Sequence, residues 1–232
     1  MKIALLGYGK MGKVIERIAL ERGHEIVLHK SSSTGFDGLE LADVAIDFSI
    51  PDAAVANITA CFERGIPVVS GTTGWLADYS KMVALCHEKS GAFIYGSNFS
   101  LGVNLFFELN SHLAKMMAKF DQYNVRMEEI HHTQKLDKPS GTAITLAEGV
   151  MAHSGHTQWT IESPSPDELS IEVKRIENVP GTHRIFYESA VDTIEISHTA
   201  HNREGFAFGA VIAAEWLAPR QGVFTMKDVL EL

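Results

Sequence analysis

The segment EEIHHTQKLDKPSGTAI, residues 128–144, carries several side chains whose types and spacing could perform chemistry. His131 and His132 are adjacent, and Lys135 follows shortly after them. An imidazole can give up or take a proton near neutral pH, so a histidine beside an anion site is able to act as a general acid. The question raised by this segment is whether such an anion site stands next to the histidines.

A triplet in the same segment, Ser140-Gly141-Thr142, follows Pro139 and precedes a helical pattern. The start of a helix offers hydroxyl and backbone N–H groups at its positive end, and a glycine there permits close approach of a ligand. Lys135 adds a cation. The combination favours a carboxylate as the bound group.

Two other interpretations of the histidines are open. In a strand, His131 and His132 point to opposite faces and cannot easily ligate one ion. His153 and His156 form an H-x-x-H pair, but no cysteine or nearby carboxylate in the sequence completes a zinc set. We therefore expect no metal. A solvated strand end is the remaining alternative, and it leaves the clustering with Lys135 unexplained.

A second group of candidate residues is GYGKMG, which contains Gly7, Gly9 and Gly12. It follows an apolar run and opens a helical pattern, as a dinucleotide-binding fingerprint does. Gly7 permits the tight turn, Gly9 lets the backbone approach a pyrophosphate, and Gly12 allows close packing of helix and strand. A tight turn without a ligand is the alternative.

The cofactor type depends on HKSSS, residues 29–33. An NAD-binding chain usually carries a carboxylate at this point for the ribose hydroxyl, but none occurs before Asp37. Lys30 beside hydroxyls such as Ser31 suits a 2′-phosphate better. We expect NADPH, or use of both NADPH and NADH, unless Lys30 is merely a solvated charge.

The elements that position these residues differ between the two halves of the chain. Apolar runs and helical patterns alternate over the first half, which predicts a doubly wound parallel sheet with ligands at the carboxyl ends of its strands. The expected strands are residues 2–7, 24–29, 42–49, 66–71 and 92–98, and the expected helices are 10–23, 51–65 and 76–91.

The second half predicts an α+β domain. Along this half of the chain the expected helices are 101–120, 140–151 and 205–218, and the expected strands are 123–132, 169–179, 182–189 and 192–200, followed by a short tail. Alternating polar and apolar residues in the last three strands predict an antiparallel sheet with one covered face. We expect a dinucleotide-binding domain of residues 1–98 with about 206–232, a substrate-binding and oligomerisation domain of residues 99–205, and a homo-oligomer.

Composition narrows the class of protein. The 232 residues carry a net charge of −9, so nucleic-acid binding is not expected. The two cysteines, Cys61 and Cys86, lie in partly apolar stretches and are expected to be buried thiols. The N-terminal apolar run is too short for a signal peptide, and a membrane span needs about 20 apolar residues. We expect a cytoplasmic protein with no membrane association.

The segment EEIHHTQKLDKPSGTA resembles the E-x-H-H-x-x-K-x-D-x-P-S-G-T-A signature of the 4-hydroxy-tetrahydrodipicolinate reductase family. GYGKMG, DVAIDFS, PVVSGTTG, SNFSLGVN and GFAFGAVIAAEWL follow the family's order, so the resemblance covers essentially the whole chain. It implies an α/β Rossmann-type domain, a second α+β domain with a mixed or antiparallel sheet, and usually a homotetramer. The implied reaction, in lysine and diaminopimelate synthesis, passes hydride from NADPH or NADH to ring C4 of a cyclic dicarboxylate, with loss of water.

The resemblance also implies residue roles. His131 is the expected general acid, Lys135 assists it and binds a carboxylate, and His132, Ser140, Gly141 and Thr142 hold the substrate. The implied cofactor contacts are Gly7, Gly9, Lys10, Met11, Gly12, Phe48, Ser49, Gly71, Thr72, Thr73, Ser97, Asn98, Phe99, Arg203 and Phe206. Ser31 stands where many members carry an acidic residue, and the connection after it is short.

Two alternative functions remain compatible with the fold class. One is another nicotinamide-dependent enzyme such as an amino-acid dehydrogenase, which would need a lysine or histidine elsewhere for its substrate. The other is a non-catalytic nucleotide sensor, which has no use for a proton donor such as His131 beside an anion site.

Overall fold

The computed structural model describes residues 1–202 and 204–232, and the chain divides into two compact units. The first unit contains Met1–Leu101 and Glu204–Leu232, and the second contains the intervening residues from Gly102. Arg203, one of the expected cofactor contacts, lies outside the described residues. Within the described part of the chain, no helix is both long and apolar enough to cross a membrane.

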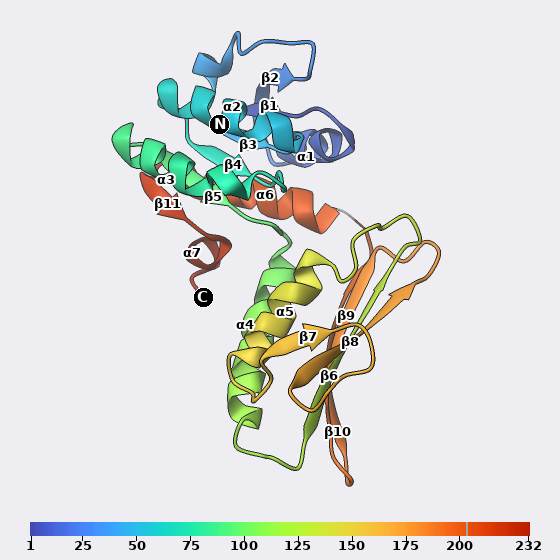
Figure 1. Ribbon diagram of the computed structural model, residues 1–232. Coiled ribbons are helices and arrows are strands. Elements are labelled where there is room, and N and C mark those ends of the chain that lie inside the picture. The colour runs from blue at the N-terminus through green and yellow to red at the C-terminus, as the bar shows by residue number, and fades with distance from the viewer. Residues whose placement is uncertain (203) are drawn as a thin grey trace. The chain divides into compact units, whose positions relative to one another are not determined.

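The first unit is built on a six-stranded parallel sheet in the order β11-β5-β4-β3-β1-β2 (Figure 1). Its strands are β1 (Lys2–Leu6), β2 (Glu25–Lys30), β3 (Val44–Asp47), β4 (Val68–Ser70), β5 (Ala92–Tyr95) and β11 (Gly222–Phe224). Its helices are α1 (Lys10–Glu21), α2 (Pro51–Glu63), α3 (Tyr79–Glu88), α6 (Glu204–Leu217) and α7 (Met226–Leu230), with short 3-10 turns at Leu39–Leu41 and Leu76–Asp78. The predicted Rossmann-type fold class is confirmed.

The sheet is buried on both faces because its strands alternate between two apolar cores. In β1, Ile3 and Leu5 pack with residues of α1 and α6, while Ala4 and Leu6 pack with residues of α2 and α3. Helices on both sides are what a parallel sheet requires, since each strand connection must cross a face.

The C-terminal segment of the first unit, expected to be a short tail, forms β11 and α7, so the expectation of a tail was wrong. β11 pairs with β5 through only Gly222–Phe224, a run too short for a strand pattern to be recognised. α7 begins at a capping box in which Thr225 and Asp228 satisfy each other's backbone N–H groups.

The second unit packs two helices on one face of a five-stranded sheet in the order β10-β9-β6-β8-β7 (Figure 1). Its helices are α4 (Leu101–Met117) and α5 (Gly141–Met151), and its strands are β6 (Asn124–His131), β7 (Gln158–Thr160), β8 (Glu168–Arg175), β9 (Gly181–Glu188) and β10 (Thr193–Ala200). α4 begins at Leu101, which is the last residue of the first of the two segments that make up the first unit.

The prediction that the last three strands form an antiparallel sheet was wrong for β8. β6 is the central strand, antiparallel to β9 on one side and parallel to β8 on the other. The chain between β6 and β8 passes through α5 and β7, and a crossover with a helix delivers the next strand in parallel. Side-chain alternation shows which residues share a face, but it carries no information about strand direction.

The side chains of β6 that face the helices are apolar in the first part of the strand and polar at its end. Val125 and Met127 pack in the apolar core formed with α4 and α5. Glu129 and His131 follow at the same alternation, so they lie on this covered face beyond the apolar part. A buried carboxylate and imidazole at this place mark the candidate site of the second unit.

Candidate active site

Three strands bring four polar side chains together at the end of β6. Glu129 is opposite His183 of β9, and His131 is paired with Arg175 of β8. All four are largely or wholly buried: Glu129 has no exposed surface, His183 is 5% exposed and His131 is 8% exposed, and the Arg175 side chain is 10% exposed. Buried charges need partners, so the contacts among them define the site.

The Glu129 carboxylate is the point where these contacts converge. Its Oε1 accepts a hydrogen bond of 3.0 Å from Nη2 of Arg175, and its Oε2 accepts one of 3.0 Å from the backbone N–H of Ser140. Oε2 also lies 3.5 Å from Nδ1 of His131 and 3.8 Å from Nε2 of His183. One carboxylate therefore touches β6, β8, β9 and the start of α5.

Ser140 is the N-cap of α5, so its hydroxyl caps the first turn of this helix. Its Oγ accepts from the N–H of Ala143 at 3.2 Å and lies 3.2 Å from Nε2 of His183. Gly141, the first residue of the helix, is exposed, and a Cβ on it would meet no described atom within 4 Å. The helix start therefore offers backbone N–H groups to an anion at Gly141, while the Ser140 side chain is engaged in capping.

The loop between β6 and α5 is held by Arg175. Its guanidinium donates to the carbonyl of Lys135 at 3.3 Å and to the carbonyl of Asp137 at 2.6 Å. The Lys135 ammonium lies 2.9 Å from Oδ1 of Asp137, a carboxylate that is more than half exposed. Because Asp137 is at the surface, a ligand carboxylate could exchange with it at Lys135 at little cost.

The histidines of the site favour the neutral form. Burial lowers the pKa of His131 to about 4; Glu129 opposes this shift, while Lys135 and Arg175 add to it. Burial also lowers the pKa of His183 to about 3, aided by His131. Nδ1 of His131 and Nδ1 of His132 are buried without a hydrogen-bond partner among the described residues. A ligand that brings negative charge here would favour the imidazolium of His131.

Glu129, His131 and His183 also offer one ligand atom each within 4.8 Å of one another. This set, which differs from the pairs considered from the sequence, has the donor types of a zinc site. Two cations oppose a metal ion here: Arg175 binds Glu129 at 3.0 Å, and Lys135 disfavours positive charge on His131. In a buried site such charges are weakly screened. The cluster is better suited to handling a proton and an anion.

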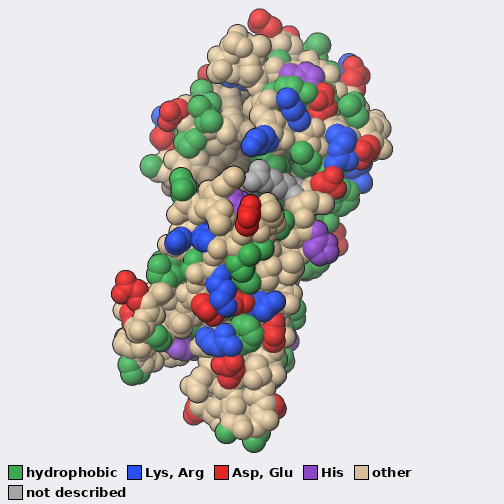
Figure 2. All heavy atoms as spheres, turned by 90° about the vertical axis from the view of Figure 1, so that its right-hand side faces the viewer, with side chains coloured by type: hydrophobic (Ala, Val, Ile, Leu, Met, Phe, Trp, Pro, Cys, Tyr) green, Lys and Arg blue, Asp and Glu red, His purple; other side chains and the backbone are tan. Residues whose placement is uncertain are grey.

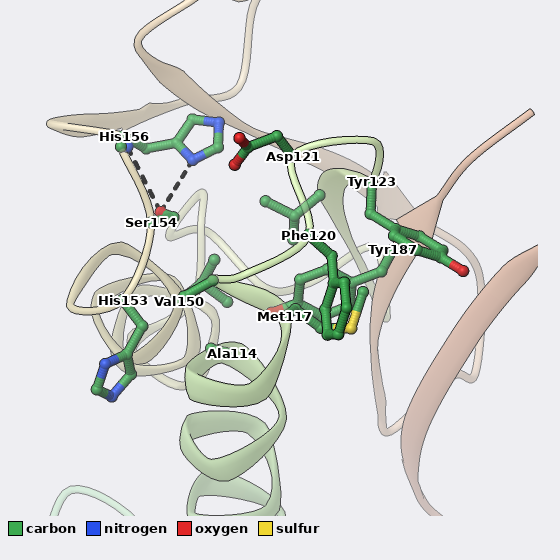
Figure 3. Close-up of a pocket in the computed structure, with 13 residues that line it drawn as sticks. Ala114, Met117, Phe120, Asp121, Tyr123, Val150, His153, Ser154, His156 and Tyr187 are labelled. Carbon is green, nitrogen blue, oxygen red and sulfur yellow. Dashed lines mark hydrogen bonds between the residues drawn. The ribbon is translucent and has the colours of Figure 1, made fainter.

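The other histidine pair lies in a different cavity of the second unit. This cavity, of about 270 Å³, is lined by the ends of α4 and α5 and by β9, and includes His153 and His156 but none of the expected site residues. The two rings point in different directions, and Nδ1 of His156 is 3.0 Å from Oγ of Ser154 (Figure 3). The H-x-x-H spacing therefore does not converge on one point.

The first unit has a cavity of about 380 Å³ at the carboxyl ends of β1, β2 and β3. This is where the strand order reverses between β1 and β3, the usual ligand position in such sheets. Six expected cofactor contacts line it, namely Gly7, Gly9, Lys30, Ser31, Phe48 and Ser49. Tyr8, Ser32, Ile50, Ala53 and Asn57 line it as well.

Three more expected cofactor contacts lie directly behind the cavity wall. The Thr72 hydroxyl accepts a hydrogen bond of 2.8 Å from the backbone N–H of Ser49. A Cβ on Gly71 would lie 2.3 Å from the Phe48 ring, and the Phe48 and Phe99 ring centres are 5.8 Å apart. The structure does not place the remaining expected residues on the cavity wall; they are Lys10, Met11, Gly12, Thr73, Ser97, Asn98 and Phe206.

Several residues of the two sites were not expected from the sequence. Asp47 is fully buried below the first cavity and accepts hydrogen bonds from Ser49, Asn57 and Ser70 at 2.7–2.8 Å. Burial raises the pKa of this carboxyl. A carboxylate directly after an apolar strand, as in DFS, was the available signal. In the second unit the unexpected residues are Glu129, Arg175, Gly181 and His183; a Cβ on Gly181 would lie 3.0 Å from Nε2 of His131.

Comparisons with known proteins cover nearly the whole chain. Residues 1–99 match the family model described as dihydrodipicolinate reductase, N-terminus, and residues 102–230 match dihydrodipicolinate reductase, C-terminus. A 4-hydroxy-tetrahydrodipicolinate reductase of Christiangramia forsetii is 56% identical over 99% of this chain and 98% of that protein. One from Archaeoglobus fulgidus is 35% identical over the full length of both.

Solved structures give the same fold at lower identity. A dipicolinate-bound dihydrodipicolinate reductase from Paenisporosarcina sp. TG-14 aligns with a TM-score of 0.74 over 97% of each chain, at 20% identity. A Gfo/Idh/MocA family oxidoreductase from Vibrio cholerae aligns with a TM-score of 0.56 at 12% identity. Because two family models match nearly the whole chain and full-length relatives are 35% and 56% identical, the chain belongs to the 4-hydroxy-tetrahydrodipicolinate reductase family of oxidoreductases, which act in lysine and diaminopimelate biosynthesis.

Proposed function

We propose that this chain reduces 4-hydroxy-tetrahydrodipicolinate to tetrahydrodipicolinate with NADPH or NADH, and that His131 is the general acid. The first unit holds the cofactor and the second holds the dicarboxylate. The observation that carries the proposal is a buried imidazole whose Nδ1 faces the Glu129 carboxylate at 3.5 Å, in the cluster that also holds Lys135 and the start of α5. The reaction consumes one hydride and one proton and releases one water.

The residues divide this work. Lys135 and the N–H groups at Gly141 bind the substrate carboxylates, and His132 contacts the substrate beside them. When bound, the nicotinamide supplies the hydride that reaches ring C4. His131 supplies the proton to the ring, so its proton must be present when the hydride arrives.

The test uses freshly generated 4-hydroxy-tetrahydrodipicolinate and follows the absorbance of NADPH and of NADH in parallel. Oxidation that requires this substrate supports the proposal. Cofactor binding without oxidation would indicate a nucleotide sensor, and oxidation with an amino-acid or keto-acid substrate instead would indicate another dehydrogenase. Either result rejects the proposed reaction.

Dicarboxylate binding should be accompanied by proton uptake at His131. In the unliganded chain the pKa of His131 is about 4, with Lys135 among the groups that lower it. A carboxylate at Lys135 opposes that influence, so the pKa rises and a larger fraction is protonated at any pH above it. Calorimetry with pyridine-2,6-dicarboxylate in two buffers of different ionisation enthalpy measures the uptake. His131→Gln should abolish it, and equal heats in both buffers with the unaltered chain would contradict it.

Lys30 should read the 2′-phosphate of NADPH. It lines the cofactor cavity, and its ammonium lies 4.8 Å from the Phe36 ring centre. Lys30→Ala should raise the KM for NADPH by about tenfold, the value of one charge-assisted hydrogen bond, and change the KM for NADH much less. Lys13→Ala, at another exposed lysine of the first unit, is the control. Equal effects of Lys30→Ala on both KM values would exclude this role.

We further propose that the chain forms a homotetramer through the face of the second sheet opposite α4 and α5. Lysine and arginine side chains alternate with acidic ones over this face (Figure 2), as in the Arg126–Glu188 and Lys174–Glu128 pairs. Nη1 of Arg184 also lies 3.4 Å from Oε1 of Glu128. Charged groups of both signs on one face can pair with the same groups of a second copy, and light scattering of the purified chain measures the mass.

A further inference from the structure

We propose that Glu129 is the positioning residue of this site: its buried carboxylate, locked by Arg175, sets the orientation and proton affinity of His131 and joins it to the anion-binding start of α5. The inference rests on the proposed role of His131 as the general acid. Glu129 itself has no exposed surface and therefore acts through His131 rather than on substrate.

The geometry leaves the carboxylate one orientation. Arg175 holds Oε1 at 3.0 Å, and the Ser140 N–H holds Oε2 at 3.0 Å. With both oxygens engaged, the group cannot rotate without breaking a buried hydrogen bond. Oε2 is thereby kept 3.5 Å from Nδ1 of His131, close enough to take a hydrogen bond from the imidazolium after a small adjustment.

Arg175 extends this arrangement to the rest of the site. The guanidinium that binds Glu129 also donates to the carbonyls of Lys135 and Asp137. Arg175 thus ties the loop that carries Lys135 to the same carboxylate that holds Ser140 and faces His131. The Glu129 carboxylate, together with Arg175, therefore fixes the positions of the proton donor, the substrate-binding cation and the helix start relative to one another.

The charged groups around His131 determine how easily its imidazole is protonated. The titratable or charged groups facing His131 are Glu129 on its own strand, Lys135 and Asp137 on the loop, Arg175 on β8 and His183 on β9. Lys135 and Arg175 disfavour the imidazolium, and Glu129 is the fully buried group that favours it. Without the Glu129 charge, protonated His131 would face two cations with only Asp137, at the surface, in support.

The test is Glu129→Gln, which keeps the side-chain shape and an acceptor for the Ser140 N–H but removes the charge. If His131 is a general acid, kcat falls as pH rises through its pKa in the complex. The variant should move this alkaline limb to lower pH, and a limb displaced by one pH unit means a kcat about tenfold lower at each pH along it. The KM for the dicarboxylate should change less than kcat, because Lys135 and α5 remain.

Glu215→Gln is the matched control. The Glu215 carboxylate on α6 lies between an arginine and a histidine, as Glu129 does: Oε1 is 2.7 Å from Nε of Arg22 and 2.7 Å from Nε2 of His24. The variant removes a carboxylate paired with a histidine, but outside the site, so it should leave the pH profile unchanged. If Glu129→Gln does not fold, Glu129→Asp retains the charge but retracts it by one methylene, and it should shift the profile in the same direction by a smaller amount.

The pKa of His131 in the unliganded chain, measured by NMR with ¹³C-labelled histidine, separates this inference from the proposed function. An inactive wild-type chain rejects the proposed reaction, while the NMR titration still tests whether Glu129 acts on His131. A lower pKa in Glu129→Gln than in the wild type supports the inference. An active wild type with unchanged pH profile and unchanged His131 pKa in the variant overturns it.

Discussion

Replacing His131 with Gln should lower kcat by about 10²–10⁴, the usual contribution of a general acid, because we propose that this imidazole supplies the proton. Glutamine fills a similar space and can donate a hydrogen bond, but it cannot release a proton near neutral pH. The proposed carboxylate-binding groups at Lys135 and Gly141 are unchanged in this variant, so the KM for the dicarboxylate should stay within a few-fold of its original value. Loss in kcat without loss in KM is the signature of an interaction made in the transition state.

Steady-state kinetics across pH give the decisive measurement for His131. The pH-dependent limb assigned to the general acid should disappear in His131→Gln together with the activity. His156→Gln is the control, because this histidine lies in the same unit but bonds to Ser154 in a separate cavity. Turnover of His131→Gln near that of the control would remove His131 from the proton-transfer step.

A pair of glycine substitutions separates cofactor binding from folding in the first unit. A Cβ on Gly12 would lie 2.3 Å from the carbonyl oxygen of Gly7, a backbone atom that cannot move aside cheaply. Gly12→Ala should therefore cost about 1–3 kcal/mol of stability, as overpacking does. A Cβ on Gly9 would meet no described atom within 4 Å, and the φ of Gly9 is −88°. Gly9→Ala should change stability by less than about 0.5 kcal/mol.

Cofactor affinity should be affected by Gly9→Ala, the variant that leaves stability nearly unchanged. We expect a bound pyrophosphate to approach the helix start through the open space beside Gly9, so a methyl group there should raise the Kd for NAD(P)H by about tenfold or more, which corresponds to about 1.4 kcal/mol of binding free energy. Thermal unfolding and fluorescence titration of both variants measure the two effects. Normal cofactor affinity in a stable Gly9→Ala variant would show that the phosphates do not pass this residue.

The first unit could be predicted largely from the sequence because its signals are local. A strand, a glycine turn and a helix follow one another within a few residues at GYGKMG, and each apolar run of the sheet is bounded by polar residues. The same locality located the cavity residues that follow β1, β2 and β3. The capping box at Thr225 and Asp228 was equally local, and it could have revealed α7.

The second site could be predicted only in part, because half of it comes from distant strands. His131, Lys135 and Ser140 lie within one segment, whereas Arg175 and His183 reach Glu129 only through the pairing of β6 with β8 and β9. Strand alternation places Arg175 on a face but does not say which strand lies beside it. The parallel arrival of β8, which the sequence did not reveal, is what pairs Arg175 with His131.

The insertion of the second unit between Leu101 and Glu204 has a consequence for how the protein is made. One face of the first sheet is covered by α1 together with α6 and α7, and α6 and α7 follow the second unit in the chain. The whole sequence of the second unit is therefore synthesised before α6, and until then Ile3 and Leu5 are covered on this face by α1 but not by α6. The first unit can therefore complete its core only after the second unit has been synthesised, and a nascent chain halted before α6 would present the incompletely covered face to chaperones.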